Sequence, residues 1–209
     1  MKLSARSSFL VIAAATVLGA GAMLATPATG AAAAPTWAPA ASASIHPGVQ
    51  MYTEGAQCTA NFVFTDGAGT TYVGYAAHCA GTGEATDTNG CDAVSLPLGT
   101  RVQFVEGGSL VGAGTTVGEG TLTYSSWLTM QQRGETDPAT CDYNDLALVQ
   151  VDADDVAKVN PSVPFWGGPV GINTEGTAAG DTVYSYGNSS LRAGVELLSP
   201  KQGTSLGTE

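Results

Sequence analysis

Residues 60–76 read ANFVFTDGAGTTYVGYA, and this stretch predicts a β-hairpin. Residues 60–66 and 70–76 are runs rich in β-branched and aromatic side chains, which is the composition of strands. Between the runs lie Gly67 and Gly69, which accept the positive φ that a tight hairpin turn needs. This part of the chain is therefore expected to form antiparallel β structure.

Three further runs have the composition of strands. Residues 101–106 alternate polar and apolar side chains, and residues 182–186 read TVYSY. Residues 146–151, LALVQV, are almost continuously apolar, which predicts a strand covered on both faces. Helical periodicity is nearly absent, and residues 152–159 could form one or two helical turns at most. Short strands separated by Gly, Asn and Asp predict an all-β fold, either a sandwich or a barrel.

The first 34 residues have the order of a secretory signal peptide. Lys2 and Arg6 form a short positive region, residues 9–24 are apolar, and small residues follow. The apolar run is shorter than the roughly 20 residues of a membrane-spanning helix, so we expect a secreted, extracellular protein and not a membrane anchor. Residues 35–44, PTWAPAASAS, predict a linker or a short pro-segment, and residues 45–209 are expected to form the globular domain.

The charge of the chain restricts its partners. Residues 45–209 contain all 18 acidic residues and five of the seven basic ones, hence a net charge of −13. A surface this negative repels phosphate backbones, which argues against nucleic acid as a partner. Self-repulsion of this size is typical of a soluble exported protein, and we expect a monomer that does not bind membranes once the signal peptide is removed.

All four cysteines lie in the region expected to be exported, and their even number favours two disulfides. They are Cys58, Cys79, Cys91 and Cys141. A zinc site is the alternative, but the chain has no C-x-x-C pair and its two histidines, His46 and His78, are far apart in sequence. We expect no metal and no cofactor, and we place His46 on the surface beside Pro47.

Two motifs contain residues that could carry chemistry. Residues 75–79, YAAHC, end a predicted strand and contain His78, and residues 144–149, NDLALV, begin another and contain Asp145. Either motif alone is more often structural than catalytic. In this order they resemble the motifs T-A-A-H-C and D-[IL]-A-L-[LV] of the trypsin/chymotrypsin-like serine proteases, in the style of the bacterial secreted members. The resemblance implies two packed β-barrels with the catalytic groups in the cleft between them.

The resemblance assigns His78 and Asp145 their roles. A histidine with a pKa near neutrality takes a proton from a serine hydroxyl and returns it to the leaving amine. A carboxylate bonded to its other ring nitrogen fixes the tautomer and stabilises the imidazolium. The implied reaction is therefore hydrolysis of a peptide bond in a polypeptide substrate. Because Asp145 begins an apolar strand, we expect it to be shielded from water.

The same resemblance implies a disulfide between Cys58 and Cys79. Cys91 and Cys141 then remain to form the second disulfide. That bond would anchor the segment just before Asp145.

The nucleophile of this family lies in a G-D-S-G motif well after the aspartate, and this motif does not occur in the 209 residues. Ser189 and Ser190 lie too close to Asp145 along the chain. Ser205 matches the G-x-S-x-G elbow only formally, because that elbow expects its aspartate and histidine later in the chain. We therefore expect a fragment without the catalytic serine, inactive by itself, with the first barrel complete and the second partial. The alternative is a secreted, non-catalytic binding module.

Overall fold

The computed structural model describes residues 35–82, 88–192 and 195–208. The predicted signal peptide, residues 1–34, lies outside this part of the chain. No helix in the described part is long and apolar enough to cross a membrane. The predicted boundaries after residues 34 and 44 stay predictions.

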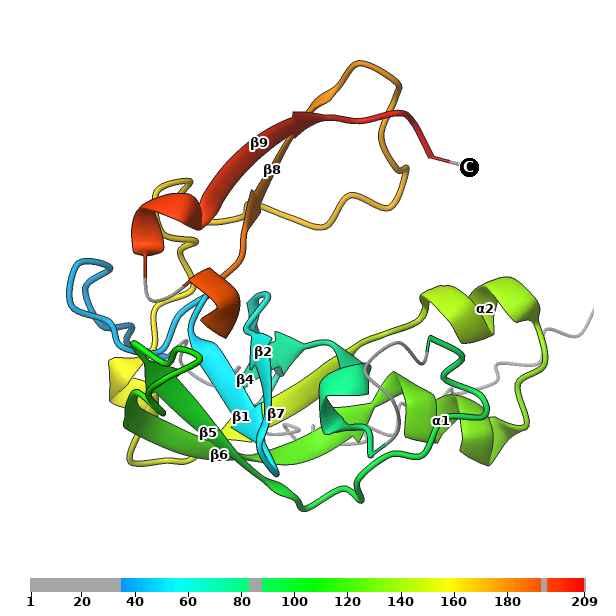
Figure 1. The fold of residues 1–209 in the computed structure, drawn as a ribbon, viewed down its shortest axis with the longest axis horizontal. Coiled ribbons are helices and arrows are strands. Elements are labelled where there is room, and N and C mark those ends of the chain that lie inside the picture. Colours follow the sequence, from blue (N-terminus) through cyan, green and yellow to red (C-terminus); the bar gives the residue numbers. More distant parts are fainter. Residues whose placement is uncertain (1–34, 83–87, 193–194, 209) are drawn as a thin grey trace, which may run out of the picture. The chain divides into compact units, whose positions relative to one another are not determined.

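A seven-stranded antiparallel sheet forms most of the regular structure (Figure 1). Its strands are β1 Gln50–Thr53, β2 Ala56–Thr59, β3 Val63–Thr65, β4 Thr71–Tyr75, β5 Arg101–Glu106, β6 Thr115–Ser125 and β7 Ala147–Val151. They lie in the order β2-β1-β5-β6-β7-β4-β3, and neighbouring strands are antiparallel. The described chain is mostly β, as the composition predicts.

The hairpin predicted around Gly67 and Gly69 is formed by β3 and β4. Its turn is closed by Asp66, whose Oδ1 accepts hydrogen bonds from the amides of Ala68 and Thr70, both at 2.9 Å. Gly69 has a φ of +83°, which explains the glycine at this position, whereas Gly67, for which a positive φ was also expected, does not have one. The prediction of the hairpin is confirmed, with strands a few residues shorter than the runs suggested.

The two strands at the ends of the sheet order, β2 and β3, are neighbours in the sequence. Residues 60–62 connect them and are themselves hydrogen-bonded to the sheet. The amide of Ala60 donates to the carbonyl of Val49 at 2.9 Å, and the amide of Asn61 donates to the carbonyl of Gly74 at 2.8 Å. One continuous segment thus pairs with β1 at its start and with β4 at its end.

The core of the sheet consists of side chains from one face of each strand. Val73, Phe104 and Val149, on β4, β5 and β7, are completely buried. The prediction that β7 is covered on both faces is wrong, because Leu148 is only half-buried and Gln150 is exposed. Successive side chains of a strand point to opposite faces, and only one face of β7 meets the core.

Two α-helices follow β6, although the sequence shows almost no helical periodicity. Helix α1 spans Ser126–Arg133 and helix α2 spans Pro138–Tyr143. Both have ordinary end signals in the sequence. Ser125 caps the start of α1, Gly134 ends it in the left-handed conformation, and Asp137 caps α2 before a proline. The expectation of almost no helix is wrong because helices of six and eight residues are too short to show a periodic pattern.

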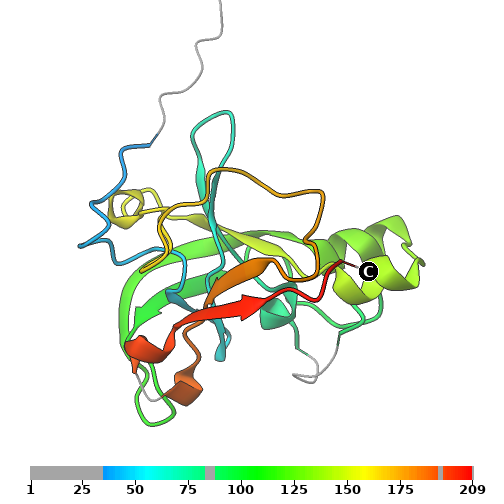
Figure 2. The same cartoon turned by 90° about the horizontal axis from the view of Figure 1, so that it is seen from above.

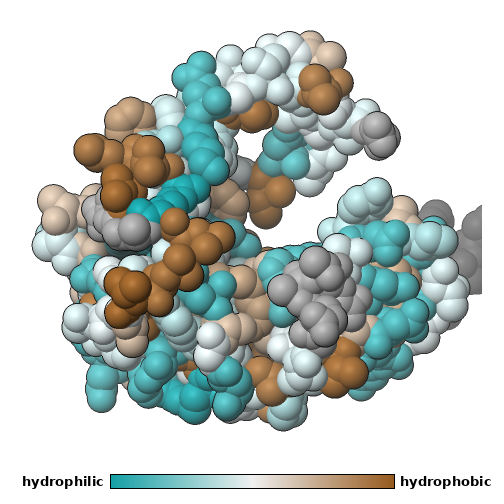
Figure 3. Space-filling model, viewed as in Figure 1, coloured by the Kyte–Doolittle hydropathy of each residue, from teal (hydrophilic) through white to brown (hydrophobic). Residues whose placement is uncertain are grey.

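A second sheet has two strands, β8 Thr182–Tyr186 and β9 Pro200–Thr204, which form an antiparallel pair (Figure 2). The bounds of β8 are those predicted. Four of the five residues in each strand are exposed. Exposed apolar side chains, among them Leu191 and Leu197, gather on the short 3-10 helices between the two strands, η3 Ser190–Arg192 and η4 Glu196–Leu198 (Figure 3).

Residues 35–44, predicted to be a linker or pro-segment, contact the domain through Ala38. The amide of Ala38 donates to the carbonyl of Val159 at 2.9 Å, and the side-chain amide of Asn160 donates to the carbonyl of Ala38 at 2.6 Å. The helical turn predicted just before Asn160 is the 3-10 helix η2, Val156–Lys158.

Candidate functional site

The register of the sheet brings His78 and Asp145 together. Strands β4 and β7 are antiparallel neighbours, and Tyr75 at the end of β4 lies opposite Ala147 at the start of β7. His78 follows Tyr75 within the short helix η1, Ala77–Ala80, and Asp145 just precedes Ala147. In an antiparallel pair, the last residue of one strand lies beside the first residue of its neighbour. Two residues 67 positions apart in sequence therefore become adjacent.

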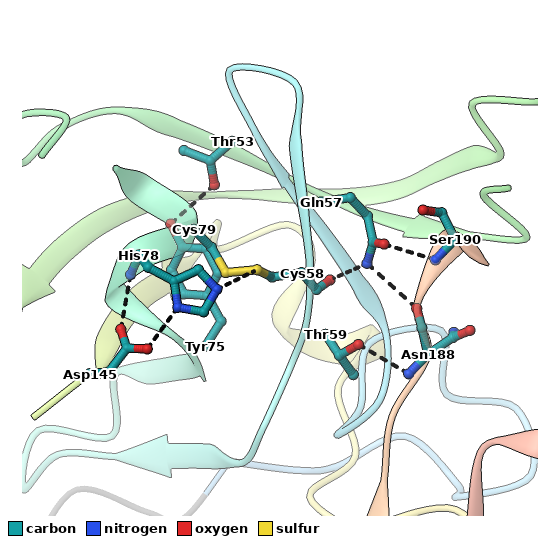
Figure 4. Close-up of a disulfide and its surroundings, with 10 residues drawn as sticks. All are labelled: Thr53, Gln57, Cys58, Thr59, Tyr75, His78, Cys79, Asp145, Asn188 and Ser190. Atoms are coloured by element: carbon teal, nitrogen blue, oxygen red, sulfur yellow. Dashed lines mark hydrogen bonds and ion pairs between the residues drawn. A yellow bond between two sulfur atoms is a disulfide. The ribbon is translucent and has the colours of Figure 1, made fainter. Parts of the chain in front are cut away.

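His78 and Asp145 are joined by two hydrogen bonds (Figure 4). Nδ1 of the imidazole donates to Oδ2 of Asp145 at 2.7 Å, and the backbone amide of His78 donates to Oδ1 at 2.9 Å. The carboxylate thus holds both the ring and the backbone of the same residue. With Nδ1 as the donor, Nε2 of the neutral ring carries the lone pair and can accept a proton.

Ser126, the buried first residue of α1, holds the segment that contains Asp145. Its hydroxyl donates to the carbonyl of Asn144 at 2.7 Å and accepts from the amide of Leu146 at 3.0 Å. Its own amide donates to the carbonyl of Leu146 at 2.8 Å. The backbone on both sides of Asp145 is therefore fixed. Sequence reasoning missed Ser126, because no motif marks a serine that acts through such distant backbone groups.

The expectation that Asp145 is shielded from water is wrong. Its side chain is 32% exposed, and that of His78 is 43% exposed. Asp145 lies just before the first residue of β7, outside the paired part of the strand, so it does not share the burial of Ala147 and Val149. The pair is consequently accessible from solvent.

Contact between the two side chains shifts both pKa values in the direction that favours an ion pair. The hydrogen bond with Asp145 raises the pKa of His78 above 6.5, against the opposing effect of partial burial. Partial burial by itself raises the pKa of Asp145. The hydrogen bonds from the side chain and backbone of His78 outweigh it and leave that pKa below 3.8. The arrangement therefore suits an imidazole that receives a proton at Nε2.

One disulfide lies beside this pair, and the other lies just before Asp145 along the chain. Cys58 on β2 is bonded to Cys79, the residue after His78, with Cα atoms 6.1 Å apart. Cys91 is bonded to Cys141 of α2, with Cα atoms 5.3 Å apart. This pairing is the one that the resemblance implies, and both Cα separations lie in the usual range. The first disulfide ties the helical turn that carries His78 to β2.

One group of possible metal ligands occurs in the described part of the chain. It consists of Cys58, His78 and Cys79, whose ligand atoms lie within 4.8 Å of one another. The two sulfur atoms are joined in a disulfide, and only thiolates bind metal ions well. The oxidised chain therefore offers the imidazole of His78 alone at this place.

On the other side of Cys58, strand β2 binds the segment that follows β8 (Figure 4). The amide of Asn188 donates to Oγ1 of Thr59 at 3.0 Å, and the amide of Ser190 donates to Oε1 of Gln57 at 2.9 Å. The side-chain amide of Asn188 donates to the carbonyl of Gly48 at 3.1 Å. We call these interactions the Asn188 contact. Sequence reasoning missed them, because they join residues 129 to 140 positions apart and match no motif.

None of the candidate serines is hydrogen-bonded to His78. Ser189 and Ser190 belong to the segment held by the Asn188 contact, and the hydroxyl of Ser205 is hydrogen-bonded to that of Thr177 at 2.6 Å. Across the described ranges, no hydroxyl group forms a hydrogen bond with Nε2 of His78. The structure thus brings together two of the residues that the motifs single out and, in its described part, no serine hydroxyl bonded to Nε2 of His78.

His46 was expected at the surface and is only partly exposed. It is half-buried, with Nδ1 at 2.8 Å from the carbonyl of Pro47. Its neighbours Ile45 and Pro47 are buried, so this part of the chain is packed and is not a free arm.

No protein-family model, curated protein or solved structure matches this chain. The likeness to the serine proteases therefore rests on the two motifs, read together with the geometry of His78 and Asp145.

Proposed function

We propose that this chain carries the histidine and aspartate of a secreted serine endopeptidase of the trypsin/chymotrypsin-like type, acting on polypeptides. His78 is the general base and general acid, and Asp145 orients it. The observation that carries the proposal is the 2.7 Å hydrogen bond from Nδ1 of His78 to Oδ2 of Asp145. The second bond, from the histidine amide to Oδ1, makes a chance contact between surface side chains a poor explanation.

Proton transfer takes place at Nε2 of His78. Asp145 accepts the Nδ1 proton and so keeps the tautomer in which Nε2 carries a lone pair. Nε2 takes the proton of a serine hydroxyl as the oxygen attacks the peptide carbonyl, and the nearby carboxylate stabilises the resulting imidazolium. The imidazolium then returns the proton to the leaving amine as the C–N bond breaks.

The fold that goes with this function is a pair of β-barrels. The continuous segment of β2 and β3 is hydrogen-bonded to β1 at its start and to β4 at its end, which supports a closed first barrel. In this proposal β8 and β9 are a hairpin of the second barrel. The Asn188 contact is then a junction between the two barrels.

The proposed mechanism needs a serine in a G-D-S-G motif, which the 209 residues do not contain. We propose that it belongs to a longer form of the chain. A phosphonate that reacts with active-site serines tests this. The longer polypeptide encoded by the same reading frame should incorporate the label at that serine, and the 209-residue chain should not. Asp145→Asn should slow the labelling of the longer form by a factor on the order of 10⁴.

The control for this experiment is His46→Ala, which removes the other histidine and should label at the unaltered rate. Labelling of the 209-residue chain at Ser205, or unaltered labelling of the longer form in His78→Ala, would contradict the proposal. A reading frame that stops after residue 209 would contradict the proposal as well.

A second candidate function is a non-catalytic binding module. It is favoured by a mostly apolar pocket of about 480 Å³, whose lining includes Phe62, Trp166 and Tyr184 but neither His78 nor Asp145. For a binding module, Trp166→Ala should abolish the binding of a ligand in this pocket, while His78→Ala should leave that binding unchanged. The opposite result supports the enzyme.

A further inference from the structure

Three groups that bind zinc in proteins converge beside Asp145. They are the sulfur atoms of Cys58 and Cys79 and the imidazole of His78, and Figure 4 shows the ring between the carboxylate and the disulfide. Sγ of Cys58 lies 3.9 Å from Nε2 of His78. In a tetrahedral zinc site, bonds of about 2.3 Å to sulfur and about 2.0 Å to nitrogen place these two ligand atoms roughly 3.5 Å apart. The observed separation is close to that spacing.

His78 is already oriented as a metal ligand would be. A zinc-bound histidine commonly donates its other ring N–H to a carboxylate, which fixes the tautomer and the ring orientation. Nδ1 of His78 makes this bond to Asp145 at 2.7 Å and leaves Nε2 directed to the sulfur atoms. The side chain of His78 is 43% exposed, so a water molecule can complete the coordination.

The sulfur atoms become ligands only when the disulfide is reduced. A dithiol reductant supplies two electrons, the S–S bond breaks, and the products are two cysteine thiols and the cyclic disulfide of the reductant. Zinc then replaces one proton on each sulfur, so two protons are released for each ion bound. The half-buried position of Cys58 gives the reductant access. A tetrahedral site needs the sulfur atoms about 3.8 Å apart. Rotation of two side chains whose Cα atoms are 6.1 Å apart can provide this spacing.

We propose that the reduced chain binds one zinc ion through Cys58, Cys79 and Nε2 of His78, with Asp145 as the carboxylate behind the histidine. Disulfide formation and zinc binding exclude each other, because they use the same sulfur atoms. The ion also occupies the nitrogen that accepts the proton in the proposed proteolysis. Only this last consequence rests on the proposed function.

A metal titration of the 209-residue chain tests the site. The chain is reduced with the dithiol, freed of it, and titrated with Co²⁺, whose thiolate complexes absorb strongly in the near ultraviolet. Zn²⁺ is then added as the competitor. We expect one tightly bound ion per reduced chain and none in the oxidised chain. Asp145→Asn should weaken the affinity 10- to 100-fold. His78→Ala should weaken it at least as much, and His46→Ala, the matched histidine control, should not change it.

Two double variants separate a built site from the thiols of an unfolded chain. Cys91→Ser/Cys141→Ser keeps the proposed ligands and should bind Co²⁺ with unaltered affinity. Cys58→Ser/Cys79→Ser keeps the other pair and should lose the tight site. Equal binding by the two variants, or unaltered binding in His78→Ala, would overturn the proposal. So would a reduced chain that keeps its circular dichroism spectrum and binds no ion. None of these results depends on serine labelling, so this proposal and the proposed function fail separately.

Discussion

The seven-stranded sheet and the β8–β9 hairpin are both antiparallel β structure but are held in different ways. Val149 on β7 is completely buried, whereas Val183 on β8 is 37% exposed. The five inner strands of the sheet have a partner on each edge, whereas β8 and β9 pair with each other alone in the described structure. The hairpin is connected to the sheet by the polar interactions of the Asn188 contact and by the ring of Tyr186, which lies against Gly48.

This difference shows what strand composition does and does not provide. β-branched and aromatic residues favour an extended backbone in the sheet and in β8 alike, but stability comes from apolar surface removed from water. A two-stranded hairpin by itself is marginally stable in water. We therefore expect β8 and β9 to open at a lower free energy than the sheet.

The largest effect should come from the same truncation made in the two regions. Val149→Ala leaves a cavity in the core of the sheet and should lower the free energy of unfolding by about 2–3 kcal/mol. Val183→Ala should lower it by less than about 0.5 kcal/mol, because this side chain already meets solvent. Denaturant unfolding of both variants gives the two values. Equal losses would contradict the contrast between the regions.

A smaller and more local effect should follow from Asn188→Ala. This change removes the hydrogen bond to the carbonyl of Gly48 and should lower the opening free energy of β8 and β9 by about 1 kcal/mol. Hydrogen exchange should then accelerate roughly fivefold in these strands and not in β7. Asn173→Ala is the matched control, because the hydrogen bonds of Asn173 stay within its own loop. Faster exchange in β7 would show that the hairpin and the sheet open together.

The smallest effect on stability should come from changes to the His78–Asp145 pair. The pKa of His78 then shows whether the hairpin contributes to the pair. Asp145→Asn removes the carboxylate and should lower the pKa of His78, measured by NMR titration. Asn188→Ala should leave this pKa unchanged, since the hydrogen bonds of His78 and Asp145 do not involve Asn188. If both variants lowered it equally, the hairpin would have to take part in the site.

The pH dependence of stability follows from the same pair. The folded pKa of His78 lies above 6.5, so its contribution is fully present below pH 6.5 and is lost as the pH rises through the folded pKa. The folded pKa of Asp145 lies below 3.8, so its contribution is present above that value and is lost as the pH falls through the folded pKa. Solvent screening of the partly exposed side chains keeps both contributions small.

The sequence by itself determined the features that depend on nearby residues. Strands β5 and β8 have the predicted bounds, and the turn after Asp66 has the predicted positive φ at Gly69, because strand alternation and turn chemistry act over a few positions. His78 and Asp145 were recognisable as candidates because each lies in a short motif. The capping signals of α1 were equally local, but a serine and a glycine at the ends of eight residues are too common to indicate a helix without a periodic pattern.

Only the tertiary structure decided how these parts meet. Tyr75 pairs with Ala147, and this register places His78 beside Asp145. The hydroxyl of Ser126 is hydrogen-bonded to the backbone on both sides of Asp145. The partial exposure of Asp145 follows from its place just beyond the end of β7, which its apolar neighbours in sequence do not reveal. Strand register and long-range hydrogen bonds depend on which strands pack together. The burial of the whole core determines that packing, and it involves residues far apart in the sequence.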